Sequence, residues 1–269
     1  METYNVIDVH HSMPLINLGE MDVVILAGGE GTRLRKVLSD RPKPMAEINN
    51  RPFLDILIEH VSSYGYKRFI LCTGYKADFI QKYYNSAKIP QTILFSEETI
   101  PLGTGGAVKK AEKFIQSSPF LVMNGDSFCP VNMYEFVDFH KQNDSFLSMV
   151  IVESENLKDF GLLALDSSQK IINFKEKIER DGKSYINAGI YLFDKDVLSM
   201  IPQNVKYSLE YDLFPKLVGG EFYGFITKEN LMDIGTPERY EHAKKFFKNV
   251  LLINPPQVTE DDFDVTEEL

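Results

Sequence analysis

The stretch Leu26-Ala27-Gly28-Gly29-Glu30-Gly31-Thr32-Arg33-Leu34 follows directly on the apolar run 23–27, which predicts a buried strand. Its three glycines can adopt positive φ and bring backbone N–H groups close to a phosphate chain. Tight turns also use glycine for purely structural reasons, so the loop alone leaves both interpretations open. The Walker pattern GxxxxGK[ST] and the dinucleotide pattern GxGxxG are both absent. Arg33 and the downstream Arg41-Pro42-Lys43-Pro44-Met45 favour the phosphate-binding interpretation, and the two absent patterns exclude an ordinary kinase or dinucleotide loop.

Apolar runs alternate with amphipathic segments through the first half of the chain, as they do in a series of βαβ units. Such a series forms a mostly parallel sheet with right-handed crossovers, and ligands bind at the carboxyl ends of its strands. The expected fold is α/β, with a Rossmann-like sheet flanked by helices. The expected strands are 23–27, 69–72, 92–95 and 120–123, and the expected helices are 52–64, 77–85, 106–116 and 133–143.

After Ser145 the pattern changes to strand-like runs joined by short polar links, which predicts a mixed half that covers the site. A last helix is expected at 237–248 because proline suits its first turn. We expect one domain at 21–249, an N-terminal extension at 1–20, and an acidic, mobile tail at 250–269. The strand-like runs are 146–152, 162–165, 171–174 and 186–193.

Composition excludes several classes of function. The formal net charge of −10 gives no broad positive field for a polynucleotide, so nucleic acid is not an expected partner. Cys72 and Cys129 lack the spacing of a disulfide framework or a zinc site. No apolar run approaches the length of a membrane span, and the first residues lack the pattern of a signal peptide. We expect a cytoplasmic protein without membrane contact. The sequence leaves homo-oligomerisation open.

The glycine loop and the proline-flanked Lys43 together resemble the sugar-nucleotide pyrophosphorylase (nucleotidyltransferase) family. The resemblance extends over about residues 21–248, because four further segments follow in the order typical of the family. They are Leu102-Gly103-Thr104-Gly105-Gly106, Asn124-Gly125-Asp126, Phe174-Lys175-Glu176-Lys177 and Asp233-Ile234-Gly235-Thr236-Pro237. The family's fold is of the nucleotide-diphospho-sugar transferase type, and its members join a nucleoside triphosphate to a sugar 1-phosphate and release pyrophosphate.

The resemblance implies that cationic side chains and backbone amides hold the triphosphate. Arg33 would grip the β- and γ-phosphates, and Lys43 would bridge phosphate oxygens near the reacting centre. The implied nucleotide-binding residues are Leu26, Ala27, Gly28, Gly29, Gly31, Thr32, Glu98, Gly103 and Thr104.

Asp126 and Asp233 are each expected at the end of a strand, where an open α/β sheet presents its ligands. Two carboxylates together with substrate phosphates suit Mg²⁺, and the resemblance assigns both residues to that ion. An aspartate beside glycine also commonly caps a turn or a helix. The position of both within the larger pattern favours the metal.

The resemblance assigns the sugar 1-phosphate to the second half of the chain. Glu176 would hold a sugar hydroxyl and Lys177 the sugar's phosphate, although a solvated surface pair is the alternative. Lys175 and Lys177 share one strand face, and only the resemblance selects Lys177. Asn187 and Gly189 match further sugar-pocket positions, as does Gly161, which could equally be a turn residue.

Glu98 bears on the choice of base, because a carboxylate only accepts hydrogen bonds and guanine offers two adjacent donors. We therefore expect GTP, although an exposed acid on a loop is an equal alternative. Among short guanylyltransferases of this pattern, the chain resembles those that use D-glycero-α-D-manno-heptose 1-phosphate. Mannose 1-phosphate is the second candidate substrate. Cytidylyl or uridylyl transfer is the nearest competing activity. A catalytically silent regulatory homologue is the alternative from another class, but Lys43, Asp126 and Asp233 are all present.

Overall fold

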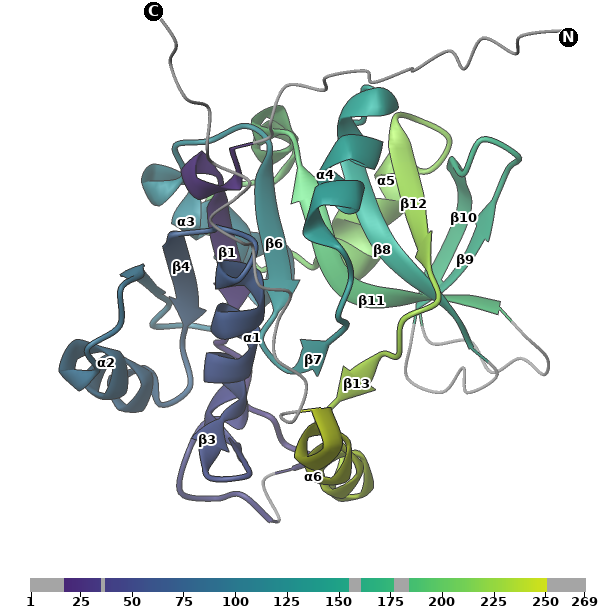
Figure 1. The fold of residues 1–269 in the computed structure, drawn as a ribbon. Helices are drawn as coiled ribbons and strands as arrows, with labels where there is room; N and C mark the ends of the chain where they lie inside the picture. The colour runs from purple at the N-terminus through teal and green to yellow at the C-terminus, as the bar shows by residue number, and fades with distance from the viewer. Residues whose placement is uncertain (1–16, 35–36, 155–160, 177–183, 251–269) are drawn as a thin grey trace, which may run out of the picture.

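The computed structural model describes residues 17–34, 37–154, 161–176 and 184–250 (Figure 1). Most of the expected extension and the expected tail lie outside this part of the chain. Within it, Leu18 is buried against the core, so the folded unit includes residues before Met21. No helix of the described residues has the length and apolarity to cross a membrane.

Four parallel strands form the first half of the main sheet, as the sequence predicts. The first is β1 (Asp22–Leu26), whose side chains alternate between two apolar layers: Val23 and Ile25 face one layer and Val24 the other. A strand buried on both faces needs such a continuous apolar run. The other three are β4 (Arg68–Thr73), β5 (Thr92–Glu97) and β6 (Phe120–Asn124).

The long strand β11 (Ser184–Phe193) joins this parallel half to a mixed half by pairing antiparallel with β6. The mixed half contains β8 (Leu147–Ser154), β9 (Gly161–Leu165), β10 (Ile171–Glu176) and β12 (Phe222–Thr227). The sheet runs β10-β9-β11-β6-β1-β4-β5, and β8 pairs with both β11 and β12. The strand β12, which was not expected from the sequence, pairs parallel with β8.

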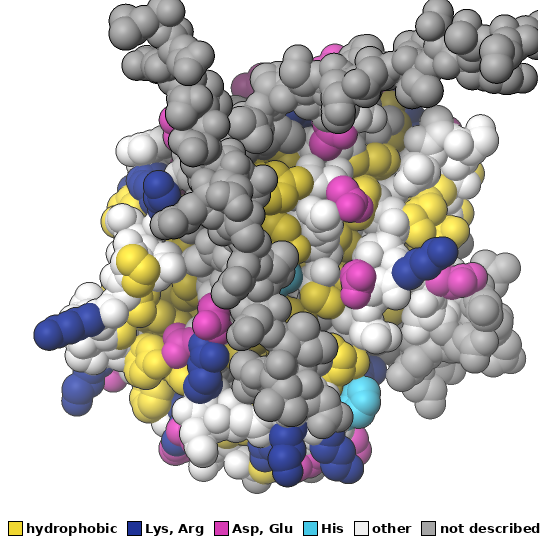
Figure 2. All heavy atoms as spheres, in the orientation of Figure 1, with side chains coloured by type: hydrophobic (Ala, Val, Ile, Leu, Met, Phe, Trp, Pro, Cys, Tyr) yellow, Lys and Arg dark blue, Asp and Glu magenta, His cyan; other side chains and the backbone are white. Residues whose placement is uncertain are grey.

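Helices cover both faces of the sheet, and each contributes an apolar stripe to one of two core layers (Figure 1). The first layer receives α1 (Phe53–Ser62), α2 (Ala77–Ser86), α4 (Met133–Gln142) and α6 (Pro237–Val250). The second receives α3 (Gly103–Ala111), α5 (Phe214–Leu217) and a π-helical turn at Leu209–Leu213. On the face shown in Figure 2, acidic and basic side chains are interspersed.

The helix expected at 106–116 is the one whose bounds differ most. It begins at Gly103 and ends at Ala111, and a 3₁₀ turn, Glu112–Phe114, follows it. The glycine motif is thus the first turn of α3 and not a loop before it. Propensity disfavours glycine inside a helix, but packing against a segment distant in sequence overrides propensity here.

Candidate active site

Two short strands bring the predicted metal ligands together. β7 (Ser127–Phe128) follows Asp126, and β13 (Met232–Asp233) ends at Asp233. The two strands pair antiparallel with Asp233 opposite Ser127, and the N–H of Ile234 donates to the carbonyl oxygen of Asp126 over 3.0 Å. Asp126 itself follows the turn at the carboxyl end of β6. The carboxylates therefore come from the sheet edge at which α/β folds bind ligands.

Lys43 lies between these two segments. Its Nζ is 2.5 Å from Oδ2 of Asp126, and it is 3.7 Å from the point where a Cβ on Gly235 would lie. The lysine side chain is only 12% exposed, whereas that of Asp126 is 41% exposed. Pro42 and Pro44 flank Lys43 in a short 3₁₀ turn, Lys43–Met45. A largely buried cation is thus held beside Asp126.

The glycine loop leaves the end of β1 and passes close to Lys43. A Cβ on Gly31, whose φ is +59°, would lie 2.9 Å from Cβ of Lys43, so glycine permits this approach. Among the described residues, and apart from its neighbours in the chain, Gly29 has no atom within 4 Å of its Cβ position, so this part of the loop borders open space. Thr32 and Arg33 are exposed at the end of the loop. The loop thus lies next to Lys43, with open space beside its middle.

Glu98 lies against the same loop from the end of β5. Its Oε1 is 2.9 Å from the Cβ positions of both Gly28 and Gly74, and its Oε2 accepts the N–H of Leu102 over 3.1 Å. Burial raises the pKa of Glu98, and the bond from Leu102 partly offsets this rise. Gly74, which the sequence analysis did not select, leaves room for the carboxylate. Glu98 is thus half-buried and fixed, not a freely exposed acid.

Gly103 and Thr104 contact a neighbouring segment of the chain. A Cβ on Gly103, whose φ is +73°, would lie 2.7 Å from the carbonyl oxygen of Tyr207. The Thr104 hydroxyl donates to Glu210 over 2.7 Å and accepts the N–H of Leu209 over 2.8 Å. These contacts give the glycine motif a structural task in addition to any contact with a nucleotide.

A bulge in β11 shapes the predicted sugar side. The pairing of β11 with β8 shifts register between Asn187 and Tyr191. Asn187 donates to the Tyr191 hydroxyl over 2.8 Å and accepts the N–H of Gly189 over 2.8 Å. Gly189 has a φ of +76°, and a Cβ there would lie 2.7 Å from Nδ2 of Asn124. Bulges near active sites commonly redirect a side chain in this way.

Two other predicted sugar residues, Gly161 and Glu176, lie on β9 and β10. These strands pair antiparallel with Gly161 directly opposite Glu176, so the main chain brings these two positions together. Gly161 is the first residue of β9 and therefore belongs to a strand. Lys177 lies outside the described residues.

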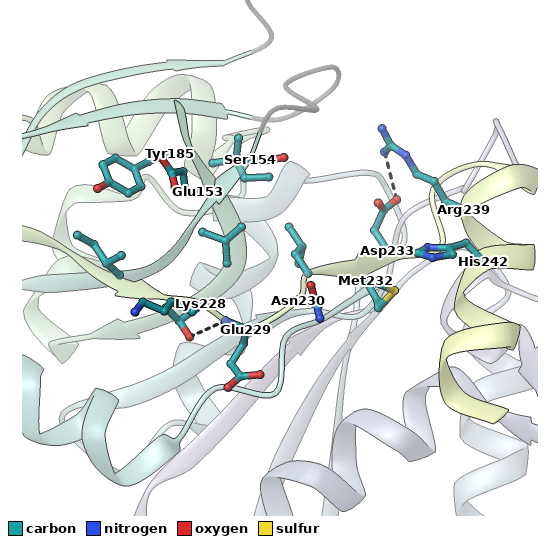
Figure 3. A pocket seen from close by; sticks show the side chains of 15 residues that line it. Glu153, Ser154, Tyr185, Lys228, Glu229, Asn230, Met232, Asp233, Arg239 and His242 are labelled. Atoms are coloured by element: carbon teal, nitrogen blue, oxygen red, sulfur yellow. Dashed lines mark hydrogen bonds and ion pairs between the residues drawn. The ribbon is translucent and has the colours of Figure 1, made fainter. Parts of the chain in front are cut away.

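A groove of about 630 Å³ borders Asp233, between the ends of β8 and β11, the link from β12 to β13, and α6. Figure 3 shows Glu153 and Tyr185 on one wall and Asp233, Arg239 and His242 at the opposite end. Arg239, which was not among the expected site residues, pairs with Asp233 over 3.2 Å. Its place in the first turn of the expected helix is a signal that the sequence does contain, because a cation there is unfavourable beside the positive end of the helix dipole unless an anion lies nearby.

The donor set fits a hard cation such as Mg²⁺. The paired segments carry the carboxylates of Asp126 and Asp233, and Mg²⁺ prefers one or two carboxylates together with phosphate oxygens and water. Among the described residues, no group of three or more His, Cys, Asp or Glu could form a complete cage for a metal. Water, and the phosphate oxygens of a bound substrate, would complete the coordination of a metal held by these carboxylates.

The chain is similar to known proteins over most of its length. The model of the nucleotidyl transferase family matches residues 22–250. A D-glycero-alpha-D-manno-heptose 1-phosphate guanylyltransferase from Campylobacter jejuni is 34% identical, over 82% of this chain and 98% of that protein. A mannose-1-phosphate guanylyltransferase from Mycobacterium tuberculosis is 32% identical, over 82% of this chain and 63% of that protein.

A similar solved structure is that of HddC from Yersinia pseudotuberculosis complexed with GMP-PN. It is 40% identical with a TM-score of 0.75, and the match covers 84% of this chain and 99% of HddC. The family match spans the strands, the glycine loop and both aspartates described above. The chain belongs to the nucleotidyl transferase family, and it is an enzyme of the nucleotidyltransferase type.

Proposed function

We propose that the protein transfers a guanylyl group from GTP to D-glycero-α-D-manno-heptose 1-phosphate in the cytoplasm. The observation that carries this proposal is the pairing of β7 with β13, which sets Asp126 and Asp233 beside Lys43 and near the glycine loop. A site for two polyanionic substrates needs this combination of a phosphate loop, a buried cation and metal-binding carboxylates.

The reaction is an in-line displacement at the α-phosphorus of the triphosphate. An oxygen of the sugar 1-phosphate forms a new bond to that phosphorus, while the bond to the oxygen shared with the β-phosphate breaks. Pyrophosphate leaves with the electron pair. A phosphate monoester is already an anionic nucleophile, so no covalent enzyme intermediate is needed. The protein's task is to position two polyanions and to neutralise charge in the transition state.

Three cationic residues divide this task in the proposal. Arg33, exposed at the end of the glycine loop, grips the departing β- and γ-phosphates. Lys43, which is largely buried next to Asp126, contacts phosphate oxygens near the reacting centre. Lys177 holds the phosphate of the sugar. Backbone N–H groups of residues 28–32 add donors that need no side-chain movement.

Asp126 and Asp233 would hold Mg²⁺, which when bound supplies positive charge to the phosphate oxygens. The donor chemistry of the two carboxylates supports this assignment. Lys43 carries its own positive charge at the same place, so it orients and partly neutralises Asp126 before the substrates arrive.

Two observations support GTP. Glu98 is held beside the glycine loop by the N–H of Leu102, and a carboxylate there can accept the two adjacent donors of guanine. The solved relative that is 40% identical is complexed with GMP-PN. Adenine and cytosine present an acceptor ring nitrogen at the corresponding edge and would meet the carboxylate less favourably.

For the sugar, the heptose 1-phosphate is favoured over mannose 1-phosphate by the identities of the relatives. Two heptose 1-phosphate guanylyltransferases are each 34% identical to this chain, and the mannose-1-phosphate guanylyltransferase is 32% identical. Mannose 1-phosphate remains the second candidate because these identities are similar. The pairing of Gly161 with Glu176 and the bulge at Gly189 support a sugar pocket beside the carboxylates.

The test is a matrix of GTP, ATP, CTP, UTP and dTTP against heptose, mannose and glucose 1-phosphates, with pyrophosphate release as the readout. We expect the highest kcat/KM for GTP with the heptose 1-phosphate. Preference for a pyrimidine triphosphate or for glucose 1-phosphate would contradict the proposal. Absence of turnover with every pair would instead favour the regulatory homologue.

A further inference from the structure

Arg239 contacts the proposed metal ligand Asp233 from the first turn of α6. Its Nη1 is 3.2 Å from Oδ1 of Asp233, and the side chains are 22% and 17% exposed, respectively. The N–H of Arg239 donates to the Thr236 hydroxyl over 3.3 Å, which anchors the start of the helix. Figure 3 shows Arg239 and Asp233 facing each other at the end of the groove. The ion pair is thus largely shielded from solvent, and its arginine is part of an anchored helix start.

Two donors converge on the same oxygen of Asp233. Besides Arg239, the N–H of Gly235 donates to Oδ1 over 2.8 Å. A Cβ on Gly235 would lie 2.7 Å from that oxygen, so glycine is needed for the carboxylate to fold back onto the turn. With Oδ1 held by two donors, Oδ2 can coordinate a cation without breaking either bond. The carboxylate is fixed at one oxygen and able to bind at the other.

The two carboxylates each have a cationic partner. Lys43 contacts Asp126, and Arg239 contacts Asp233, at the place where β7 and β13 bring both acids together. Two carboxylates that approach each other repel, and a cation beside each one reduces this repulsion. Arginine suits the task because its charge persists at every physiological pH and its planar group fixes the direction of the hydrogen bond.

We propose that Arg239 is a positioning residue, which orients Asp233 for the metal and keeps it close to Asp126 before substrates bind. This inference rests on the proposed function, because it needs Asp233 to be a metal ligand. A merely structural pair at the protein surface would affect stability by little and metal binding not at all. Hydrogen-bond partners of metal ligands commonly change metal affinity by about 10–100-fold when removed.

The test compares metal binding in variants of the full chain. Mn²⁺ binding is measured by water-proton relaxation without substrates, and Mg²⁺ activation of turnover is measured separately. We expect Arg239→Met to weaken Mn²⁺ binding by about tenfold or more, and to raise the Mg²⁺ concentration for half-maximal activity to a similar extent. At saturating Mg²⁺, kcat should stay within about twofold of wild type, because the metal again fixes the carboxylate. Arg239→Lys should restore part of the affinity.

Lys244→Met is the matched control, because Lys244 lies on the same helix and pairs with Glu241 over 2.8 Å, away from the carboxylates. Lys244→Met should leave both the Mn²⁺ affinity and the Mg²⁺ concentration for half-maximal activity unchanged. Should Arg239→Met fail to fold in a circular dichroism melt, Arg239→Gln, which keeps part of the stem and a donor, gives the same comparison. Unchanged or tighter Mn²⁺ binding in the Met or Gln variant would overturn the inference.

Asp233→Asn separates this inference from the proposed function on which it rests. If Asp233→Asn binds Mn²⁺ like wild type, the metal assignment itself fails. If Asp233→Asn loses the metal while the Arg239 variants keep it, only the role of Arg239 fails. A fall in kcat at saturating Mg²⁺ with unchanged Mn²⁺ binding would mean that Arg239 contacts substrate directly, and it would likewise overturn the positioning role.

Discussion

At the scale of single residues, Glu98 is held in one position by the main chain and can still accept hydrogen bonds from a ligand. Its Oε2 accepts the N–H of Leu102, and its Oε1 lies in the narrow space between Gly28 and Gly74. The sequence alone allowed an exposed acid at this position, but the side chain is half-buried. A carboxylate held in this way beside the glycine loop is suited to accept hydrogen bonds from a bound base.

Replacing Glu98 by Gln should therefore weaken the preference for GTP. The amide oxygen can still accept the N–H of Leu102, which turns the NH₂ group towards the nucleotide and opposite a donor of guanine. An unsatisfied buried donor costs about 1–3 kcal/mol, so kcat/KM for GTP should fall by about tenfold or more relative to the other triphosphates.

The neighbouring Glu97→Gln provides the control for Glu98. Glu97 is exposed and accepts a hydrogen bond from Gln81 over 2.6 Å, so its replacement should leave the order of triphosphates unchanged. Competition assays with paired triphosphates measure this order directly. An unaltered nucleotide preference in Glu98→Gln would show that Glu98 does not read the base, whatever the true substrate.

At the scale of elements, the first turn of α3 is fixed by the segment 205–213 packed against it. Cβ atoms on Gly103, Gly105 and Gly106 would each come within 2.8 Å of an atom in Val205 or Tyr207. Hydrogen bonds from Thr104 to Glu210 and from the N–H of Leu209 to Thr104 join the same two segments. The close approach of two backbones, together with the positive φ of Gly103, explains why glycine occurs at these positions.

Gly103→Ala should consequently destabilise the protein by about 2 kcal/mol or more. The left-handed backbone alone costs a non-glycine residue about 1–2 kcal/mol, and the new Cβ would lie 2.7 Å from a carbonyl oxygen. Urea unfolding followed by circular dichroism measures the loss.

Gly29→Ala is the matched comparison for Gly103, because no atom of the described residues beyond its chain neighbours lies within 4 Å of the Cβ position. Its free energy of unfolding should stay within about 0.5 kcal/mol of wild type. Equal stability of the two alanine variants would show that segment 205–213 does not constrain Gly103.

At the scale of the whole molecule, two largely buried histidines should make the stability of the fold depend on pH. His60 on α1 stacks edge-on against the rings of Tyr64 and Phe128, and burial lowers its pKa to about 4. His140 on α4 lies 2.9 Å from the hydroxyl of Ser148 on β8. Burial lowers the pKa of His140 to about 4 as well, although Asp194 and Asp144 partly oppose the shift.

Because these folded-state pKa values lie below the unfolded value of about 6.5, stability should be fully present above pH 6.5 and should fall towards pH 4. The unfolded chain takes up a proton that the folded chain does not. Between pH 7.5 and 5.5 the loss should be about 1.4 kcal/mol per histidine. Most carboxyl groups stay ionised in this window, so urea midpoints measured across it report mainly on the histidines.

His140→Gln should remove about half of this pH dependence while keeping a polar partner for Ser148. Stability that does not change between pH 7.5 and 5.5 in the wild-type protein would contradict the assigned burial of both rings.

The sequence by itself determined the parallel half of the sheet and the order of the motifs along it. Buried strands need continuous apolar runs and covering helices need stripes at helical spacing, and both are local properties of the chain. This is why the strands β1, β4, β5 and β6 and the helices α1, α2, α4 and α6 were predictable nearly to their ends. The family motifs supplied the residues that are predicted to bind phosphate and metal. The prediction that a strand ends at Asp233 was confirmed.

Only the tertiary structure decided which of these residues meet. The contact between Lys43 and Asp126, the pairing of β7 with β13, and the packing of Tyr207 against Gly103 join segments far apart in the chain. The same holds for the approach of Gly74 to Glu98, which no local pattern indicates. Arg239 acquired its role because the turn after β13 folds the start of α6 back onto Asp233. Periodicity records which face of an element is buried, but the partner on that face is set by the packing of the whole chain.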